Sequence, residues 1–414
     1  MALARLRRVL QSSYSVRVES SQKLVNRVTN RIAKRAQEFI AKNAPPPVTK
    51  TPIVVAAIQG QQDWIIRAID LLHKIGELTT PIGVIGVNMA RLSASWATRR
   101  YFWAVAEGDV SDRNFRLSND ARLLDFHQKT LLSDEFGVGM AGLLMEEYFN
   151  AGSFVDVSAA LNDPAVYQDI DQVEETQPDY LMWGETEGSP YYVVECKGTQ
   201  SDSSTSMGQL RRGMEQVPSL VFGAGARPIT TLVVATCMEA DRTTVYVLDP
   251  PPDEPDHDRK PDDRERVSER IGKRSWKIAS AEAFQNRIWL VKESELLKWA
   301  GQFHSALARD KRLEVIEEVP QLPNLELQTR RTEVGTFRGT AWPVFPELGK
   351  KDLKVFSGVE EELLTKIIES DATAPHAAEA IHERIVAASG YQQQRSPFVS
   401  VSRNGTCMII EGVD

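Results

Sequence analysis

The sequence predicts an α/β protein, in which a central mixed β-sheet is flanked by helices and is joined to a helical N-terminal part and an α/β C-terminal part. Between residues 123 and 249, short apolar runs that end in turn residues alternate with stretches of helical periodicity. Near the C-terminus, Asn404-Gly405 separates two apolar runs, which indicates a hairpin. The 414 residues, of which 42% are apolar, suffice for two or three domains.

Shifts in composition divide the chain into five parts. Proline-rich breaks and changes of periodicity set the boundaries. They predict a basic amphipathic helical segment (1–45), a small helical region (52–122), the core (123–249), a Pro/Asp-rich charged loop or linker (250–275) and a C-terminal α/β region (276–414).

The N-terminal segment is strongly basic in an otherwise acidic protein. Residues 1–50 carry a net charge of +9, which leaves −17 for the rest of the chain. Apolar residues at helical spacing predict a helix over 22–42, with Lys and Arg mostly elsewhere on its circumference. That basic face is either a solvated surface or a contact for phosphate or a partner. The first twenty residues also resemble an organelle transit peptide, as an alternative.

Several classes of protein are disfavoured by the composition. Three widely separated cysteines, Cys196, Cys237 and Cys407, argue against a disulfide framework or a structural zinc site and favour a reducing, cytoplasmic setting. No apolar run is long enough for a membrane-spanning helix. Phosphate-loop, HExxH and serine-elbow motifs are also missing, and His127 is interpreted as a structural histidine.

Elements within the core are predicted in the order helix, three strands, helix and two strands. The predicted helices cover 134–150 and 206–217, and the predicted strands lie near Phe154, Asp179 and Tyr191 and over 229–236 and 243–248. After the charged tract, a further helix is expected over 280–307 and the hairpin over 398–410.

Chemistry is expected where two of these strands end. Side chains alternate along a strand, so Glu195 and Lys197 share one face of the strand that begins at Tyr191, while Cys196 points the opposite way. Asp179 lies sixteen positions upstream of Glu195, and the intervening hairpin brings it back beside that residue. Two neighbouring carboxylates repel each other unless a hard divalent cation such as Mg²⁺ binds between them. With Lys197 to stabilise negative charge, this arrangement favours hydrolysis of phosphodiesters.

These residues resemble the PD-(D/E)XK nuclease superfamily over roughly 133–248, with Pro178-Asp179 and Glu195-Cys196-Lys197 as the two halves of its motif. The resemblance implies a restriction-endonuclease-like core and Mg²⁺-dependent cleavage of nucleic acid, DNA more often than RNA, with Mn²⁺ as a substitute ion. It implies that Asp179 and Glu195 bind the metal and that Lys197 is catalytic. By analogy of fold, it also suggests a bacterial restriction or anti-phage defence effector.

Two further site residues follow from the same resemblance. Gln209 resembles a fourth motif that steadies the catalytic residues or a phosphate, although Gly213 replaces the aromatic residue usual in that motif. Many members also use a first-helix glutamate as a metal ligand, for which Glu135 is favoured over Glu147 and Glu146. Glu135 has an alternative role as a charge that complements the helix dipole after Ser133 as N-cap.

Other interpretations remain open at this stage. The chain is alternatively a catalytically inactive nucleic-acid-binding or assembly subunit, in which the nuclease fold survives without cleavage. On a plain amphipathic strand, Glu195 and Lys197 would simply face solvent. A homo-oligomer or a defence-complex partner is also compatible with the sequence, and no membrane partner is expected.

Overall fold

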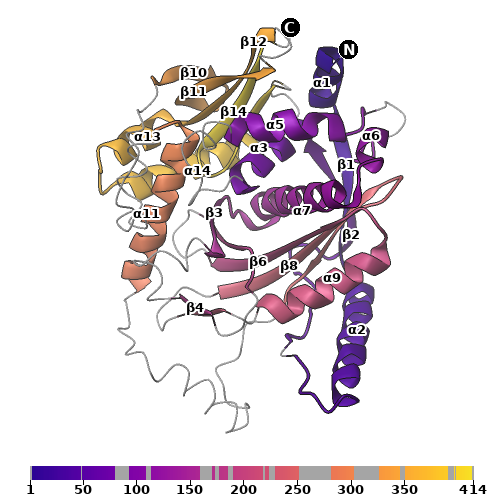
Figure 1. Cartoon of the computed structure of the whole chain (residues 1–414). Helices are drawn as coiled ribbons and strands as arrows, with labels where there is room; N and C mark the ends of the chain where they lie inside the picture. The colour runs from indigo at the N-terminus through magenta and orange to yellow at the C-terminus, as the bar shows by residue number, and fades with distance from the viewer. Residues whose placement is uncertain are drawn as a thin grey trace, which may run out of the picture.

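A computed structural model describes residues 2–47, 49–79, 93–108, 113–158, 170–172, 177–184, 190–217, 220–222, 229–250, 281–302, 326–345, 350–389, 396 and 398–412. A seven-stranded mixed sheet and a five-stranded antiparallel sheet organise these residues, with helices packed on both (Figure 1). The predicted α/β class is therefore confirmed. Among the helices of the described ranges, none is long and apolar enough to cross a membrane.

The larger sheet has the strand order β2-β1-β9-β8-β6-β5-β3. Strand β6 lies near its middle, antiparallel to β5 and parallel to β8. The strands are β1 (Ser13–Ser20), β2 (Gly60–Arg67), β3 (Ser153–Asp156), β5 (Tyr180–Trp183), β6 (Tyr191–Thr199), β8 (Ile229–Met238) and β9 (Thr243–Leu248). Two short strands, β4 (Ile170–Gln172) and β7 (Leu220–Phe222), pair separately.

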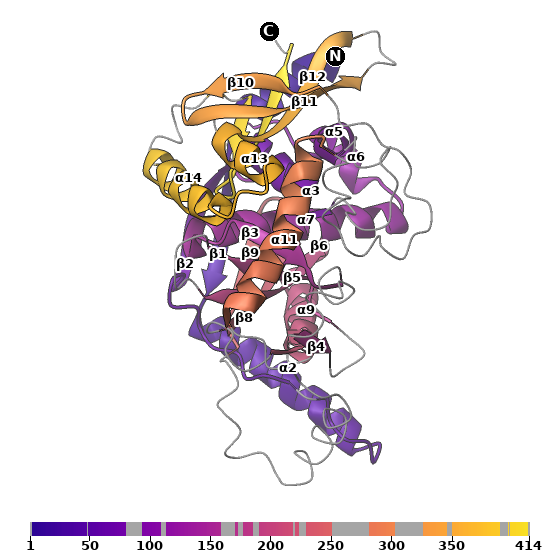
Figure 2. The same cartoon turned by 90° about the vertical axis from the view of Figure 1, so that its left-hand side faces the viewer.

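Helices cover both faces of this sheet (Figures 1 and 2). Helix α7 (Phe126–Phe149) packs on one face with α3 (Ala68–Thr79) beside it, whereas α9 (Ser203–Gln216) and α2 (Gln22–Ile40) cover the other. Alternate residues of β6 serve the two cores, so that Val194 joins the α7 side and Val193 joins the α9 side. The elements α7, β3, β5, β6, α9 and β8 follow the chain order that the sequence predicts for the core.

The N-terminal part contains two strands where the sequence analysis expected helices. Strand β1 lies inside the sheet between β2 and β9, and its Tyr14, Val16 and Val18 are buried at every second position. Strand β2 ends at Arg67, and α3 begins at the next residue, Ala68, within a largely apolar stretch. Because the period of the buried side chains changes from 2 to 3.6 within one stretch, a pattern of helical spacing does not reveal the strand. The described helices here also include α1 (Ala2–Gln11), α5 (Ser93–Tyr101), α6 (Asn119–Arg122) and a 3-10 turn (Phe102–Ala104).

The C-terminal part is built on the five-stranded sheet, with the order β10-β11-β12-β14-β13. The predicted turn at Asn404-Gly405 joins β13 to β14, and the φ angle of 87° at Gly405 explains the glycine. The elements are β10 (Gln328–Thr332), β11 (Gly335–Phe345), β12 (Lys350–Glu360), β13 (Val399–Val401), β14 (Thr406–Glu411), α11 (Ala281–Trp299), α13 (Glu361–Ile368) and α14 (Ala374–Ser389). The tract over 251–280 lies outside the described residues, and the helix expected over 280–307 ends earlier, at Trp299.

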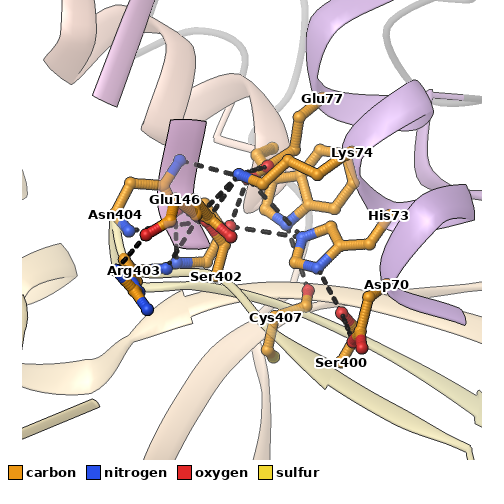
Figure 3. A network of polar contacts seen from close by, with 12 residues as sticks. Asp70, His73, Lys74, Glu77, Glu146, Ser400, Ser402, Arg403, Asn404 and Cys407 are labelled. Carbon is orange, nitrogen blue, oxygen red and sulfur yellow. Dashed lines mark hydrogen bonds and ion pairs between the residues drawn. The ribbon is translucent and has the colours of Figure 1, made fainter. Parts of the chain in front are cut away.

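A buried polar network attaches the C-terminal turn to α3 and α7 (Figure 3). The Lys74 ammonium contacts the carboxylates of Glu77 at 2.5 Å and Glu146 at 2.8 Å, and it donates a hydrogen bond to the Ser402 hydroxyl at 2.7 Å. The His73 ring stacks on Trp299, with the ring centroids 5.1 Å apart. Since the carboxylates are taken out of water, the ammonium between them is what makes their burial tolerable.

Lys74→Met is expected to lower the free energy of unfolding by about 3 kcal/mol, because it leaves two carboxylates facing each other without their cation. Urea unfolding monitored by circular dichroism measures the change. Lys366→Met is the matched control, because Lys366 pairs with Asp371 at 3.4 Å near the surface, where such pairs contribute little to stability. Equal effects of the two substitutions would contradict the role given to the network.

Candidate active site at the end of strand β6

The candidate site forms where the pairing of β5 with β6 stops. The pairing runs from Trp183 opposite Tyr191 to Tyr180 opposite Val194, so β6 continues beyond it alongside β8. Asp179 precedes β5, and its Oδ2 accepts a hydrogen bond from the backbone N–H of Cys196 at 2.7 Å. The hairpin therefore returns Asp179 to the segment of β6 that carries Glu195 and Lys197.

Glu195 and Lys197 lie on the same face of β6 and form an ion pair. The Glu195 side chain is fully buried. It lies beneath α9, since a Cβ placed on Gly213 of that helix would be 3.2 Å from the Cγ of Glu195. Lys197 is partly exposed at 23%, so its ammonium lies at the border between the buried carboxylate and solvent. Cys196 packs into the core on the opposite face, as the alternation predicts. The triplet is thus not a solvent-facing end of an amphipathic strand.

Burial and neighbouring carboxylates raise the pKa of both acids of the cluster. Burial raises the pKa of Glu195 to about 8, and the charge of Asp179 adds to the rise while Lys197 opposes it. Burial also raises the pKa of Asp179, against the opposing effects of Lys197 and the Cys196 N–H. Burial disfavours the Lys197 ammonium, but the two carboxylates outweigh it and raise its pKa. The cluster therefore carries one firmly held positive charge and two carboxylates that would gain from a further cation.

Buried oxygen atoms at the site are sparsely hydrogen-bonded within the described ranges. The Glu195 carboxylate has the Lys197 ammonium and the backbone N–H of Asp179 beside it, and the amide oxygen of Gln209 accepts no hydrogen bond. Such atoms are rare in proteins and call for an explanation. Mg²⁺ is commonly bound by one or two carboxylates together with waters and substrate phosphate, which fits Asp179 and Glu195. A cage of three or more Asp, Glu, His or Cys ligands is not found among the described residues.

Gln209 holds the backbone beside the catalytic candidate. Its Nε2 donates a hydrogen bond to the Gly198 carbonyl at 2.8 Å, directly after Lys197. One turn along α9, Gly213 stands where the resemblance expects an aromatic residue. A Cβ there would lie 2.4 Å from Val233 Cγ1, so a side chain does not fit. The departure from the motif follows from close packing of α9 on the sheet.

The structure does not bring Glu135 to the cluster. Helix α7 begins after Asp125, whose side chain caps the N–H of Gln128, and not at Ser133. Glu135 is therefore inside the helix, where its carboxylate lies 3.5 Å from the Arg100 guanidinium of α5 and burial raises its pKa. Both suggested roles, a metal ligand beside Asp179 and a charge at the helix start, lose their geometric basis.

The other glutamates of α7 lie near its far end. Glu146 belongs to the Lys74 network, and Glu147 lies 3.7 Å from the Arg403 guanidinium. At the opposite end of the helix, His127 is exposed and contacts Phe126 edge-on, so it is not the packed structural histidine that the sequence suggested. None of these three residues joins the candidate site.

Two further carboxylates, which the sequence analysis missed, influence the site electrostatically. Asp134 of α7 interacts with Lys197, which lowers its pKa against a larger rise from burial. Asp156 ends β3 opposite Tyr180 and adds to the rise in the pKa of Asp179. The signal for Asp156 was its position at the end of a predicted strand, whereas Asp134 was hidden by the wrong start of the helix.

Comparisons with known proteins add no relative to this geometry. A scan against protein-family models finds no match, and searches of curated proteins and of solved structures find none.

Proposed function

We propose that the chain is a Mg²⁺-dependent nuclease that hydrolyses phosphodiester bonds of nucleic acid, with DNA as the favoured substrate. One observation carries the proposal: Asp179, Glu195 and Lys197 converge at the end of β6, where the Glu195 carboxylate is fully buried and the charge of Asp179 adds to the rise in its pKa. Neutral packing or a surface ion pair would not require an acid to be buried in this way.

Each residue has a distinct part in the proposed reaction. When bound by Asp179 and Glu195, Mg²⁺ supplies a Lewis acid that polarises a phosphoryl oxygen and lowers the pKa of a water. Hydrogen bonding to the Cys196 N–H fixes the Asp179 carboxylate, while packing beneath α9 orients Glu195. The Lys197 ammonium remains charged and stabilises negative charge on the phosphate as the bond breaks. Gln209 positions the backbone that carries it.

Lys197→Ala is expected to reduce the rate of cleavage by about 10²–10³-fold, the typical effect of removing one group that stabilises the transition state. The assay incubates plasmid and single-stranded DNA or RNA with the wild type and the variant in Mg²⁺, in Mn²⁺ and in EDTA. Lys366→Ala controls for loss of a lysine elsewhere, because its ion pair with Asp371 lies in the C-terminal part. Cleavage that persists in EDTA, or that Lys197→Ala leaves unchanged, would contradict the proposal.

The same assay separates the enzyme from its alternative. A catalytically inactive nucleic-acid-binding or assembly subunit would bind the substrate with strong dependence on salt, yet would not cut it in either metal. Direct pairing of Lys197 with Glu195 is the observation that favours this alternative, because the ammonium occupies part of the space around a metal-binding carboxylate. Wild-type binding without metal-dependent cleavage would support it.

A further inference from the structure

We infer that helix α2 is a nucleic-acid-binding arm, whose basic ridge contacts the phosphate backbone of the substrate beside the candidate active site. The ridge consists of Lys23, Arg27, Arg31 and Lys34, and Lys42 follows the end of the helix. This inference rests on the proposed function for the identity of the ligand, and it adds the surface that would hold that ligand.

Only the beginning of α2 is buried against the rest of the protein. Its buried residues, Leu24, Val25 and Val28, all lie in the first two turns, and the rest of the helix projects past the sheet (Figures 1 and 2). Ile40 near its end is 61% exposed. A helix whose distal turns bury so little contributes little to the stability of the core. Its length therefore needs an explanation outside the fold.

Helix α2 carries a row of positive charges along one side. Spacings of three and four residues align Lys23, Arg27, Arg31 and Lys34 along one side of the helix, over about 17 Å at 1.5 Å per residue. Glu38 is the acidic residue within α2, and it pairs with Arg35 at 3.2 Å. Lys23 and Lys34 are exposed and form no ion pair or hydrogen bond within the described part of the chain. In a protein with a net charge of −8, a row of cations of this kind complements a polyanion.

The basic ridge contacts the start of α9, beside the candidate site. Arg31 donates a hydrogen bond to the Ser204 hydroxyl at 2.7 Å, and Arg27 donates one to Ser203 at 3.4 Å, both at the start of α9. Ser203 follows Lys197 by six residues, and α9 is the helix that covers Glu195. A backbone that ran along the ridge would therefore continue toward the end of β6. Contacts of this type position a nucleic acid without reading its sequence.

The test measures binding apart from cleavage. The full-length triple variant Lys23→Ala/Lys34→Ala/Lys42→Ala is compared with the wild type for binding of a fluorescent duplex and the matching single strand, in EDTA. We expect binding at least tenfold weaker. We also expect the slope of log Kd against log salt concentration to fall by about 2.7 if each lysine neutralises one phosphate. All three lysines are exposed, so a circular dichroism melt should match that of the wild type.

Two controls sharpen the result. Lys23→Arg/Lys34→Arg/Lys42→Arg keeps the charge and should bind as tightly as the wild type, while Arg331→Ala removes an exposed cation of β10 and should have no effect. Unchanged binding in the triple alanine variant would overturn the inference, as would a wild type that binds no nucleic acid. If the triple alanine variant loses only its sedimentation with anionic phosphatidylserine vesicles and binds nucleic acid as the wild type does, the inference would be overturned in favour of a membrane surface. If the triple alanine variant binds more weakly and the wild type never cleaves, the arm would be upheld and the nuclease refuted.

Discussion

Glu195→Gln is expected to reduce the rate of cleavage by about 10³-fold or more. At the same time, it is expected to stabilise the metal-free protein at pH 8. Loss of a carboxylate that would bind the cation removes several kcal/mol of transition-state stabilisation, and each 1.36 kcal/mol corresponds to about tenfold in rate. Stability changes in the opposite direction, because glutamine has the shape of the protonated acid and needs no counterion in a buried site.

The sign of the pH dependence follows from the shifted pKa. Glu195 has a pKa of about 8 in the folded protein, above the ordinary value of 4.5, so folding takes up a proton between these two pH values. The wild type therefore loses stability as pH rises from about 5 to 8 in the absence of divalent cations. In the variant this loss should be smaller, with a gain on the order of 2 kcal/mol at pH 8.

Thermal and urea unfolding in EDTA at several pH values measure this difference. Glu369→Gln, on the exposed end of α13, is the control for removal of a carboxylate without burial. Added Mg²⁺ should stabilise the wild type and not Glu195→Gln, because a bound ion stabilises only the state that binds it. A wild type whose stability rises with pH across this range would contradict the assignment.

Gly198→Ala is expected to prevent stable folding, with a loss above about 4 kcal/mol, the range that marks exceptional substitutions. A Cβ on Gly198 would lie 1.7 Å from the carbonyl oxygen and 2.5 Å from the carbonyl carbon of Ser133, which are backbone atoms that cannot turn aside. On the helix side, a Cβ on Gly137 would lie 2.9 Å from the Lys197 carbonyl. Two glycines thus let α7 touch the strand that carries the site.

Gly208→Ala provides the matched control. This glycine lies within α9, where an added Cβ would meet the Arg31 guanidinium at 3.8 Å, an ordinary contact. Alanine there should raise stability by up to about 1 kcal/mol, because it is the better helix former. Yields of soluble protein and thermal unfolding compare the two variants. A folded Gly198→Ala protein with wild-type stability would show that α7 can move away from β6.

Sequence reasoning succeeded where local patterns decide the structure. Alternation along β6 correctly separated Glu195 and Lys197 from Cys196, and the hairpin correctly returned Asp179 to them. The turn at Asn404-Gly405 was equally local. In each case, one short pattern and one turn sufficed, so long-range packing was not needed.

Errors arose where tertiary contacts override local signals. The first turns of α7 expose Phe126 and Leu131, so they lack the apolar stripe that marks a buried helix, and the start was placed eight residues late. That shift made Glu135 seem available to the site, whereas Asp134 is the residue that interacts with Lys197. Strand β1 was missed although Tyr14, Val16 and Val18 alternate, because its partner β9 lies more than two hundred residues away.

The position of β1 also bears on how the protein is made. Its hydrogen bonds on one side come from β2; on the other, Ser15 bonds to Arg113 and Phe115, and Arg17 to Glu19 pair with β9 at Thr244 to Tyr246. At about 5–20 residues per second, a ribosome needs on the order of 10–45 s to synthesise the chain between the two strands. During that interval the edge of β1 from Arg17 to Glu19 is unpaired and can pair with another chain. Aggregation of nascent chains should therefore depend on translation speed in the first half of the message.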